Sequence, residues 1–405
     1  MKRRALLLLV VALTAIWTVR AQSATPIVIL VSLDGWRWDY FDRADVPNLK
    51  ALAATGVRSQ GLIPSFPSVT FPNHYTLVTG LLPDHHGIVA NAMYDRAIGP
   101  DKFTMSSETG KDSRWWGGEP IWKTVIRHGR KSAAMFWPGS EAVHPTYWRP
   151  FDDNVSNEDR VAQALEWLKL PEADRPSFNT IYFSETDHAG HDFGPDSPEI
   201  LQAAWHVDQA IGRLVDGVRA LGLTDRTTFV LVSDHGMAPT SDQRIVFLDD
   251  YLEPEEIEVV EWSPNVEINP RATTSAEEIY QKLHDKHPAL AVYRKAELPK
   301  WLNFGTNKRI PAVIGIAELG WTVTTHGAEE KRKAEGRRFQ GGAHGYDPRY
   351  RELHGLFLAS GPELRRGVVV PEFRNIHVYD FLCKVLHVRP APNDGDLSEV
   401  ARFFR

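Results

Sequence analysis

A threonine held between two prolines is the first residue in this sequence whose setting suggests chemistry. Thr70 lies in the segment FPSVTFPNHYTLVTGLLPDHHG (residues 66–87), between Pro67 and Pro72, and a run with helical character begins just beyond it. The amino terminus of a helix presents free amides and a positive dipole end, which suit a phosphate. A threonine hydroxyl is a poor nucleophile near neutral pH, but a bound metal cation makes its alkoxide accessible. The alternative is that Thr70 is only a helix N-cap.

Three aspartates follow short apolar runs that are typical of strands. VILVSL ends in Asp34, IYFSE leads to Asp187, and TFVLVS ends in Asp234, which is followed directly by His235. Because ligand sites in an open parallel sheet form outside the carboxyl ends of the strands, we expect these carboxylates to converge on one edge. A single aspartate after a strand often only caps a turn or a helix, but three such aspartates weaken that interpretation.

Two further histidines accompany these carboxylates. His191 follows Asp187 by four residues in DHAGH, so a helical turn or a tight loop could direct both side chains at one ion, and His344 lies among glycines in GGAHGYDP. Histidines are common on surface loops, so the Asp-x-x-x-His pattern alone is a weak signal. Aspartate and histidine together favour zinc or a similar borderline ion over calcium or magnesium.

The elements that must position these residues alternate along the chain. Apolar runs predict strands over residues 26–35, 132–138, 179–185, 227–234 and 354–361. Helical spacing of apolar residues predicts helices over 158–170 and 198–222. This order predicts an α/β fold with a mostly parallel central sheet and helices on both faces. The segment from about 245 to 340 contains scattered prolines and a mixed pattern, and we interpret it as an insertion or lobe on the same domain.

Length and charge limit the classes of protein and partner. The chain has 405 residues, 42% of them hydrophobic, which is enough for a large core in one or two domains. Its 46 basic and 52 acidic residues form no long stripe of one sign, so a specific nucleic-acid partner is not expected. We interpret the basic stretch from Lys331 to Phe339 as a solvated loop, with attraction of an anionic substrate as the alternative.

The amino terminus has the pattern of a secretory signal peptide. Basic residues at positions 2–4 precede a short apolar run and then small residues, which predicts a signal peptide over residues 1–24 and a mature domain over 25–405. An uncleaved signal anchor is the alternative. Cys383 is the only cysteine, so no disulfide can form within the chain. We therefore expect a periplasmic or secreted protein without stable membrane association after signal cleavage.

Seven segments, in order along the chain, resemble the nucleotide pyrophosphatase/phosphodiesterase family of the alkaline phosphatase superfamily. They are ILVSLDGWRWDY, PSVTFPNHYTLVTGLLPDHHGIVANAMYD, GEPIW, WPGSE, ETDHAGHDFGP, VSDHGM and GGAHGYDP. The resemblance implies an alkaline-phosphatase-like sandwich. It also implies a bare catalytic domain of bacterial type, because the accessory domains of vertebrate members have no counterpart in the sequence.

The resemblance implies two zinc ions and a set of site residues. One zinc would be held by Asp34, Thr70, Asp234 and His235, and the other by Asp187, His191 and His344. Asn91 matches the family's asparagine that hydrogen-bonds a phosphoryl oxygen, with a turn residue as the alternative.

Aromatic residues are the candidates for substrate binding. Phe71 matches the family's aromatic that stacks on a nucleobase, and an opposing ring is expected near HPTYWRPFDD, where Phe151 is preferred over Tyr147 or Trp148. The further candidates are Phe103, Trp137 and Tyr182. Each of these aromatics could instead be part of the core.

The resemblance implies hydrolysis of nucleotide phosphodiester and phosphoanhydride bonds to nucleoside 5′-monophosphates, through a covalent intermediate on Thr70. The expected partner is thus a small nucleotide or other phosphodiester. One alternative is a related two-zinc hydrolase for lysophospholipid headgroup or phosphonate esters. Another is a non-catalytic zinc-binding protein, which leaves Thr70 and Asn91 unexplained. A sulfatase is set aside because Cys383 lies in DFLCKVL and not in the Pro- and Arg-containing motif of sulfatases.

Overall fold

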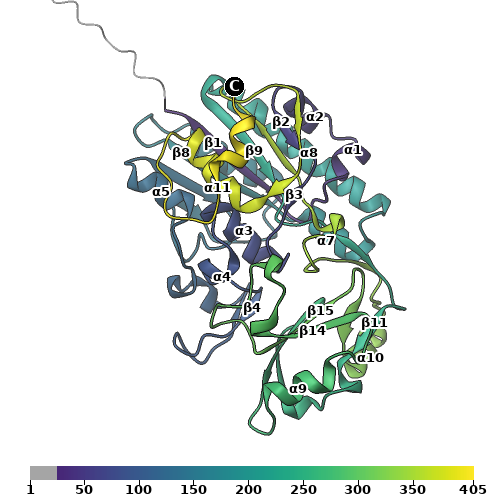
Figure 1. The fold of residues 1–405 in the computed structure, drawn as a ribbon. Coiled ribbons are helices and arrows are strands. Elements are labelled where there is room, and N and C mark those ends of the chain that lie inside the picture. The colour runs from purple at the N-terminus through teal and green to yellow at the C-terminus, as the bar shows by residue number, and fades with distance from the viewer. Residues whose placement is uncertain (1–24) are drawn as a thin grey trace, which may run out of the picture.

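An eight-stranded mixed sheet organises the part of the chain that the computed structural model describes, residues 25–405 (Figure 1). The predicted signal peptide, residues 1–24, lies outside the described residues. In spatial order the strands are β19 (Val368–Val370), β2 (Val57–Ser59), β18 (Phe357–Ser360), β9 (Thr227–Val232), β1 (Ile27–Leu33), β8 (Pro176–Phe183), β6 (Lys131–Met135) and β7 (Tyr147–Arg149).

Most strand pairs in this sheet are parallel, as predicted. β1 pairs in parallel with β8 on one side and β9 on the other, and β6 continues the parallel ladder to β7. β18 is the exception, because it runs antiparallel to both β9 and β2. The chain reaches β18 from the carboxyl edge of the sheet, where the Ser233 amide donates to the carbonyl of Leu356. A strand that starts at that edge must run against its parallel neighbours.

Helices cover both faces of the sheet, and each face has its own core. Along β1, Val28 and Leu30 pack into one core, whereas Ile29 and Val31 pack into the other, since successive strand side chains point to opposite faces. Helices α3, α5 and α11 contribute to the first core, and α2, α6 and α8 to the second. The helices are α1 (Tyr40–Arg43), α2 (Pro47–Ala54), α3 (Thr70–Thr79), α4 (Pro83–His86), α5 (Ile121–Arg127), α6 (Asn157–Leu168), α7 (Glu185–Phe193), α8 (Pro198–Ala220), α9 (Ala276–Leu283), α10 (His326–Ala334), α11 (Val378–Val385) and α12 (Leu397–Val400).

Residues 245–334 form a lobe with a sheet and a core of its own, coloured green in Figure 1. Its antiparallel strands, in spatial order, are β12 (Ile257–Glu261), β13 (Asn265–Pro270), β15 (Val313–Ala317) and β14 (Leu290–Arg294). Helix α9 packs on this sheet, and its first turn is fixed by a capping box between Ser275 and Glu278.

Four short strand pairs complete the fold. They are β11 (Ile245–Phe247) with β16 (Thr322–Thr324), β10 (Ala238–Thr240) with β17 (Gly341–Ala343), β3 (Leu62–Ile63) with β20 (Phe373–Arg374), and β4 (Ala92–Met93) with β5 (Phe103–Thr104).

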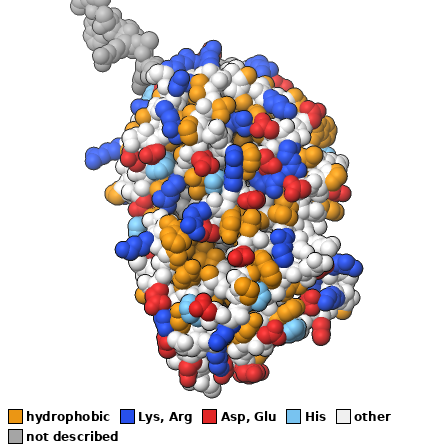
Figure 2. All heavy atoms as spheres, turned by 45° about the vertical axis from the view of Figure 1, so that its right-hand side comes forward, with side chains coloured by type: hydrophobic (Ala, Val, Ile, Leu, Met, Phe, Trp, Pro, Cys, Tyr) orange, Lys and Arg blue, Asp and Glu red, His pale blue; other side chains and the backbone are white. Residues whose placement is uncertain are grey.

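The surface carries mixed charge, and the expectation that its basic stretch forms a solvated loop needs correction. The basic stretch from Lys331 to Phe339 begins as the last turn of α10 and not as a loop, although most of its side chains are exposed. On the face shown in Figure 2, basic and acidic side chains are intermixed.

None of the helices in residues 25–405 combines the length and the apolar character that a membrane span requires.

The close approach of β18 to the turn before β2 provides a test of the packing. A Cβ atom at Gly56 would lie 2.1 Å from the carbonyl oxygen of Ala359, which is backbone and cannot rotate away. We expect Gly56→Ala to lower the free energy of unfolding by about 1–3 kcal/mol in denaturant titrations. Gly327→Ala is the control, because a Cβ there meets nothing within 4 Å and alanine favours the helix. Equal stability of the two variants would contradict this packing.

Candidate active site

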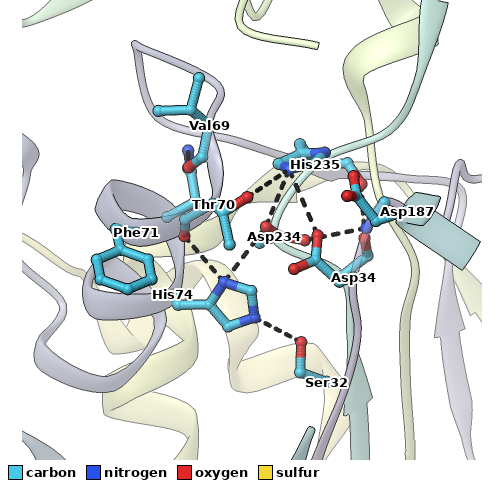
Figure 3. Close-up of polar contacts among 12 residues, drawn as sticks. Ser32, Asp34, Val69, Thr70, Phe71, His74, Asp187, Asp234 and His235 are labelled. Carbon is cyan, nitrogen blue, oxygen red and sulfur yellow. Dashed lines mark hydrogen bonds and ion pairs between the residues drawn. The ribbon is translucent and has the colours of Figure 1, made fainter. Parts of the chain in front are cut away.

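Two buried carboxylates and a histidine meet at the carboxyl ends of neighbouring strands. Asp34 follows β1, and Asp234 and His235 follow β9; since these strands are parallel and adjacent, their ends lie side by side. The Nε2 atom of His235 lies 3.1 Å from Asp234 Oδ2 and 3.5 Å from Asp34 Oδ1 (Figure 3). The three side chains are at most 1% exposed as residues and could hold one metal ion. Two of the three carboxylates predicted to converge, Asp34 and Asp234, thus lie together at this edge.

A second group of similar type comes from α7 and the strand β17. Asp187 and His191 lie one turn apart on α7, which resolves the choice between a helical turn and a loop, and His344 follows β17. Asp187 Oδ1 lies 3.5 Å from His191 Nε2 and 3.8 Å from His344 Nε2. These three residues could hold another metal ion. A Cβ at Gly341, whose φ is +137°, would lie 2.0 Å from the carbonyl oxygen of His191, so only glycine allows β17 this close to α7.

The two groups adjoin through stacked imidazole rings. The ring centroids of His235 and His344 are 3.5 Å apart, with 10° between the ring planes. Each histidine of the site also places Nδ1 beside a backbone carbonyl oxygen: His235 at 2.9 Å from Gly236, His191 at 2.9 Å from Gly342 and His344 at 3.0 Å from Ser68. Because a carbonyl can only accept, each Nδ1 carries a proton, and each Nε2 is the ring nitrogen left to face the site.

Charges at this edge are poorly compensated by protein groups alone. Burial and the charge of Asp234 raise the pKa of Asp34 well above its usual value. Burial opposes ionisation of Asp234 as well, but His235 and His74 outweigh it and hold the pKa of that carboxyl well below its usual range. Burial and the neighbouring histidines lower the pKa of His344, which keeps the ring neutral.

Three carboxylate oxygens at this edge have no hydrogen-bond partner among residues 25–405. They are Asp34 Oδ1, Asp187 Oδ1 and Asp234 Oδ2. Buried acceptors are almost always satisfied, so such oxygens mark a place for a missing donor or cation. The donor set, carboxylate oxygens with imidazole nitrogens, fits a borderline divalent metal.

Thr70 stands over the first group at the start of α3. Its Oγ1 lies 3.4 Å from His235 Nε2, whereas Phe71 points to the other side of the helix (Figure 3). Val69, not Thr70, is the N-cap residue, and Thr70 is the first residue of the helix. The helix therefore begins at Thr70 rather than beyond it, and the hydroxyl is not used for capping. The side-chain oxygen of Asn91 accepts the amide proton of Phe71 at 2.9 Å, so Asn91 borders the same helix start.

His74 belongs to this site although sequence reasoning missed it. Its Nδ1 lies 2.9 Å from the carbonyl oxygen of Thr70 and 3.3 Å from Asp234 Oδ2, and its Nε2 lies 2.7 Å from Ser32 Oγ. This ring links the helix that carries Thr70 to the carboxylate of Asp234 (Figure 3). The sequence signal for His74 was its position four residues after Thr70, which places both residues on the same face of a helix.

An aromatic cavity of about 480 Å³ opens beside Thr70. Four of the predicted aromatics line it: Phe71, Trp137, Phe151 and Tyr182. The Tyr182 hydroxyl also donates to Asp34 Oδ2 at 2.6 Å, and the Trp137 indole N–H donates to the carbonyl oxygen of His74 at 3.1 Å.

One predicted aromatic, Phe103, does not line this cavity, and one that lines it was not predicted. Phe103 is fully buried and packs edge-on against Phe71, with ring centroids 6.0 Å apart, so it supports that ring from behind and does not line the cavity. The alternatives Tyr147 and Trp148 lie on β7 and are not among the lining residues. Trp116, which sequence reasoning missed, lines the cavity and packs on Phe71 at 5.8 Å.

Comparisons with known proteins agree on one family. The family described as type I phosphodiesterase / nucleotide pyrophosphatase matches residues 28–347. The chain is 37% identical over 384 residues to ectonucleotide pyrophosphatase/phosphodiesterase family member 3 of Bos taurus, covering 91% of this chain and 43% of that protein. It is 36% identical over 382 residues to a venom phosphodiesterase of Macrovipera lebetinus, covering 91% and 44%. The chain thus spans less than half the length of these curated relatives.

A solved structure extends the likeness to the fold. Murine ectonucleotide pyrophosphatase/phosphodiesterase 5 matches with a TM-score of 0.87 and 33% identity, covering 94% of this chain and 100% of that one. That structure is of an inactive threonine-to-alanine variant in complex with AMP. Sequence and fold together show that this chain belongs to the type I phosphodiesterase / nucleotide pyrophosphatase family of the alkaline phosphatase superfamily.

Proposed function

We propose that this chain is a two-zinc phosphodiesterase and pyrophosphatase that releases nucleoside 5′-monophosphates through a covalent phospho-threonine at Thr70. The carrying observation is the position of the Thr70 hydroxyl, 3.4 Å from His235 Nε2 in the first of two adjoining groups of candidate metal ligands. Family membership and the AMP complex of the murine relative support the same reaction class and a nucleotide substrate.

The residues present fit two zinc ions. Asp34, Thr70, Asp234 and His235 would hold one, and the other would be held by Asp187, His191 and His344. Zinc ions bound there would supply Lewis-acid stabilisation of the attacking and leaving oxygens and make the threonine alkoxide accessible.

The chain's own residues would then perform a double displacement. Thr70 Oγ1 attacks phosphorus, a P–O bond to Thr70 forms, and the bond to the leaving group breaks. Water attacks the phospho-threonine, breaks that P–O bond and releases the monophosphate. Because the oxygen of Asn91 is occupied by the Phe71 amide, its NH₂ group is left to donate to a phosphoryl oxygen.

The aromatic cavity would bind the nucleobase. Phe71 and Phe151 both line it, and Phe151 is 51% exposed, which leaves its ring free for a ligand. The substrate would be a small nucleotide ester or anhydride, and the protein would act in the periplasm or outside the cell.

Metal content is the first test. We expect the purified chain to contain two zinc ions and to lose activity after chelation, because the unpartnered carboxylate oxygens converge on both groups. His191→Ala should lower zinc from two ions to about one ion per chain in elemental analysis. The control His326→Ala removes an exposed histidine paired with Asp250 and should keep both ions. Full activity after exhaustive chelation would rule out the metal mechanism.

Base stacking is the second test. Phe71→Ala should weaken kcat/KM for p-nitrophenyl thymidine 5′-monophosphate by the equivalent of about 1–3 kcal/mol, the usual worth of a base–aromatic stack. A small aryl phosphodiester without a base should lose much less, and Trp205→Ala, an exposed position on α8, should change neither substrate. Equal losses on both substrates would remove Phe71 from the base pocket. Comparison with p-nitrophenyl phosphate separates diesterase from monoesterase activity.

The role of the Thr70 hydroxyl is the third test. Thr70→Ala should abolish diester turnover, whereas Thr70→Ser should retain part of it, because the oxygen stays and only the methyl that restricts its rotamer is lost. Two displacements give net retention at phosphorus, and direct attack by water gives inversion. Hydrolysis of a chiral phosphorothioate diester in isotopically labelled water should therefore proceed with retention. Inversion would show that threonine is not the nucleophile.

A further inference from the structure

A second, smaller cavity meets the site from the side of the lobe. It has a volume of about 150 Å³, and its wall includes Asn91, His191 and His344 of the site. The opposite wall comes from β12 and β13 of the lobe and from the turn between them, and it includes Glu261, Trp262, Asn265 and Glu267. Nothing in the proposed reaction uses these lobe residues.

The lobe wall has two acidic side chains in opposed positions. The antiparallel register of β12 and β13 places Glu261 directly opposite Glu267. Like charges that face each other across a pair of strands destabilise the sheet, and Glu267 is only 1% exposed. An arrangement that costs stability and lines a cavity beside a site is expected where it serves ligand binding.

Unpartnered acceptors point to the chemistry of the ligand. Glu267 Oε2 and Asn265 Oδ1 are buried and have no hydrogen-bond partner among the described residues. Asn265 is held in this orientation because its NH₂ group donates to the carbonyl of Gly345. Two alternate residues on one face of β13, both at the cavity wall, therefore leave a side-chain oxygen without a partner.

Glu261 completes an acceptor-rich wall. Its carboxylate accepts the amide protons of Ala92 at 2.9 Å and Trp262 at 3.2 Å, which fixes it next to Asn91. Burial and the charge of Glu261 raise the pKa of Glu267 well above its usual value, and the charge of Lys102 only partly offsets this. A cationic ligand would stabilise both carboxylates, and the indole of Trp262, 42% exposed at the same wall, suits an ammonium.

We propose that the cavity between Glu261, Asn265 and Glu267 and the His191–His344 pair is a leaving-group subsite that favours an ammonium-bearing leaving group. This inference rests on the proposed function, because a diester has two arms on phosphorus. With the nucleoside arm in the aromatic cavity, the other arm is available to this second cavity. The subsite discriminates by charge: carboxylates attract an aminoalkyl group more strongly than a neutral alkyl group of nearly equal size.

The test compares two thymidine 5′-monophosphate esters of nearly equal size, the 3-aminopropyl and the butyl ester. The ratio of their kcat/KM values is measured in the native chain, in Glu267→Gln and in Glu261→Gln. We expect each substitution to lower the ratio about tenfold or more. Intrinsic differences between the two leaving groups cancel, because they are the same in every variant. Glu258→Gln on the same strand, paired with Arg96 and outside the cavity, should leave the ratio unchanged.

A binding measurement and a stability measurement accompany the kinetics. The Thr70→Ala variant should not consume the esters, so their binding can be measured by calorimetry. It should bind the aminopropyl ester more tightly than the butyl ester, and the double variant with Glu267→Gln should lose that preference. Glu267→Gln should unfold at the same temperature as the native chain or higher, because it relieves the opposed carboxyls. An unchanged ratio with both esters still hydrolysed overturns the subsite alone. If the native chain hydrolyses none of the three substrates, the aminopropyl, the butyl and the p-nitrophenyl ester, the proposed function is overturned and the subsite with it.

Discussion

Carboxylates repel one another strongly when they share a poorly solvated site. Asp34 and Asp234 meet just beyond the ends of the parallel strands β1 and β9, beside Asp187 on α7, the helix that follows β8. Protein groups relieve this repulsion only in part, since one oxygen on each carboxylate has no hydrogen-bond partner within residues 25–405. Desolvated charge of one sign is costly unless a cation compensates it. The fold holds these charges together because β1, β8 and β9 are each buried on both faces. The stabilisation from burying apolar side chains in the two cores offsets the local repulsion.

The position of Thr70 follows from contacts made around that charge. Asn91 accepts the first free amide after Thr70, and His74 joins the helix backbone to Asp234 one turn further on. The hydroxyl is thereby left without a structural role at a helix start, close to His235. Positioning by the backbone and by buried partners, rather than by a flexible loop, is what a nucleophile needs if it is to attack in a fixed direction.

Local patterns in the sequence were sufficient to predict the parallel strands and the edge of the sheet where the site lies. Apolar β-branched runs indicated the parallel strands, and the aspartates that follow them indicated the edge, because a strand end and its next residue are neighbours in any context. The direction of β18 was not predictable, since it depends on the chain returning from the lobe at the carboxyl edge. The resemblance to a family named the ligand candidates, but the support of Phe71 by Phe103 and Trp116 is a matter of tertiary packing. His74 was visible in the sequence only as helix spacing, and its contact with Asp234 required the strand order.

The opposed pair of Glu261 and Glu267 shows why the lobe could not be interpreted from sequence. Two glutamates six residues apart around a Ser-Pro turn are unremarkable as letters, and only the register of β12 against β13, shifted by an irregularity between Val259 and Glu261, sets them face to face. A slip of one residue would send Glu267 to the other face of its strand and remove it from the cavity wall. The lobe thus contributes a wall whose charge is set by strand pairing, whereas the main sheet contributes donors whose positions are set by strand ends. These two constraints are independent, because substitutions on β13 alter the cavity without touching Asp34, Asp187 or Asp234. The lobe wall can therefore vary while the carboxylate edge of the main sheet stays unchanged.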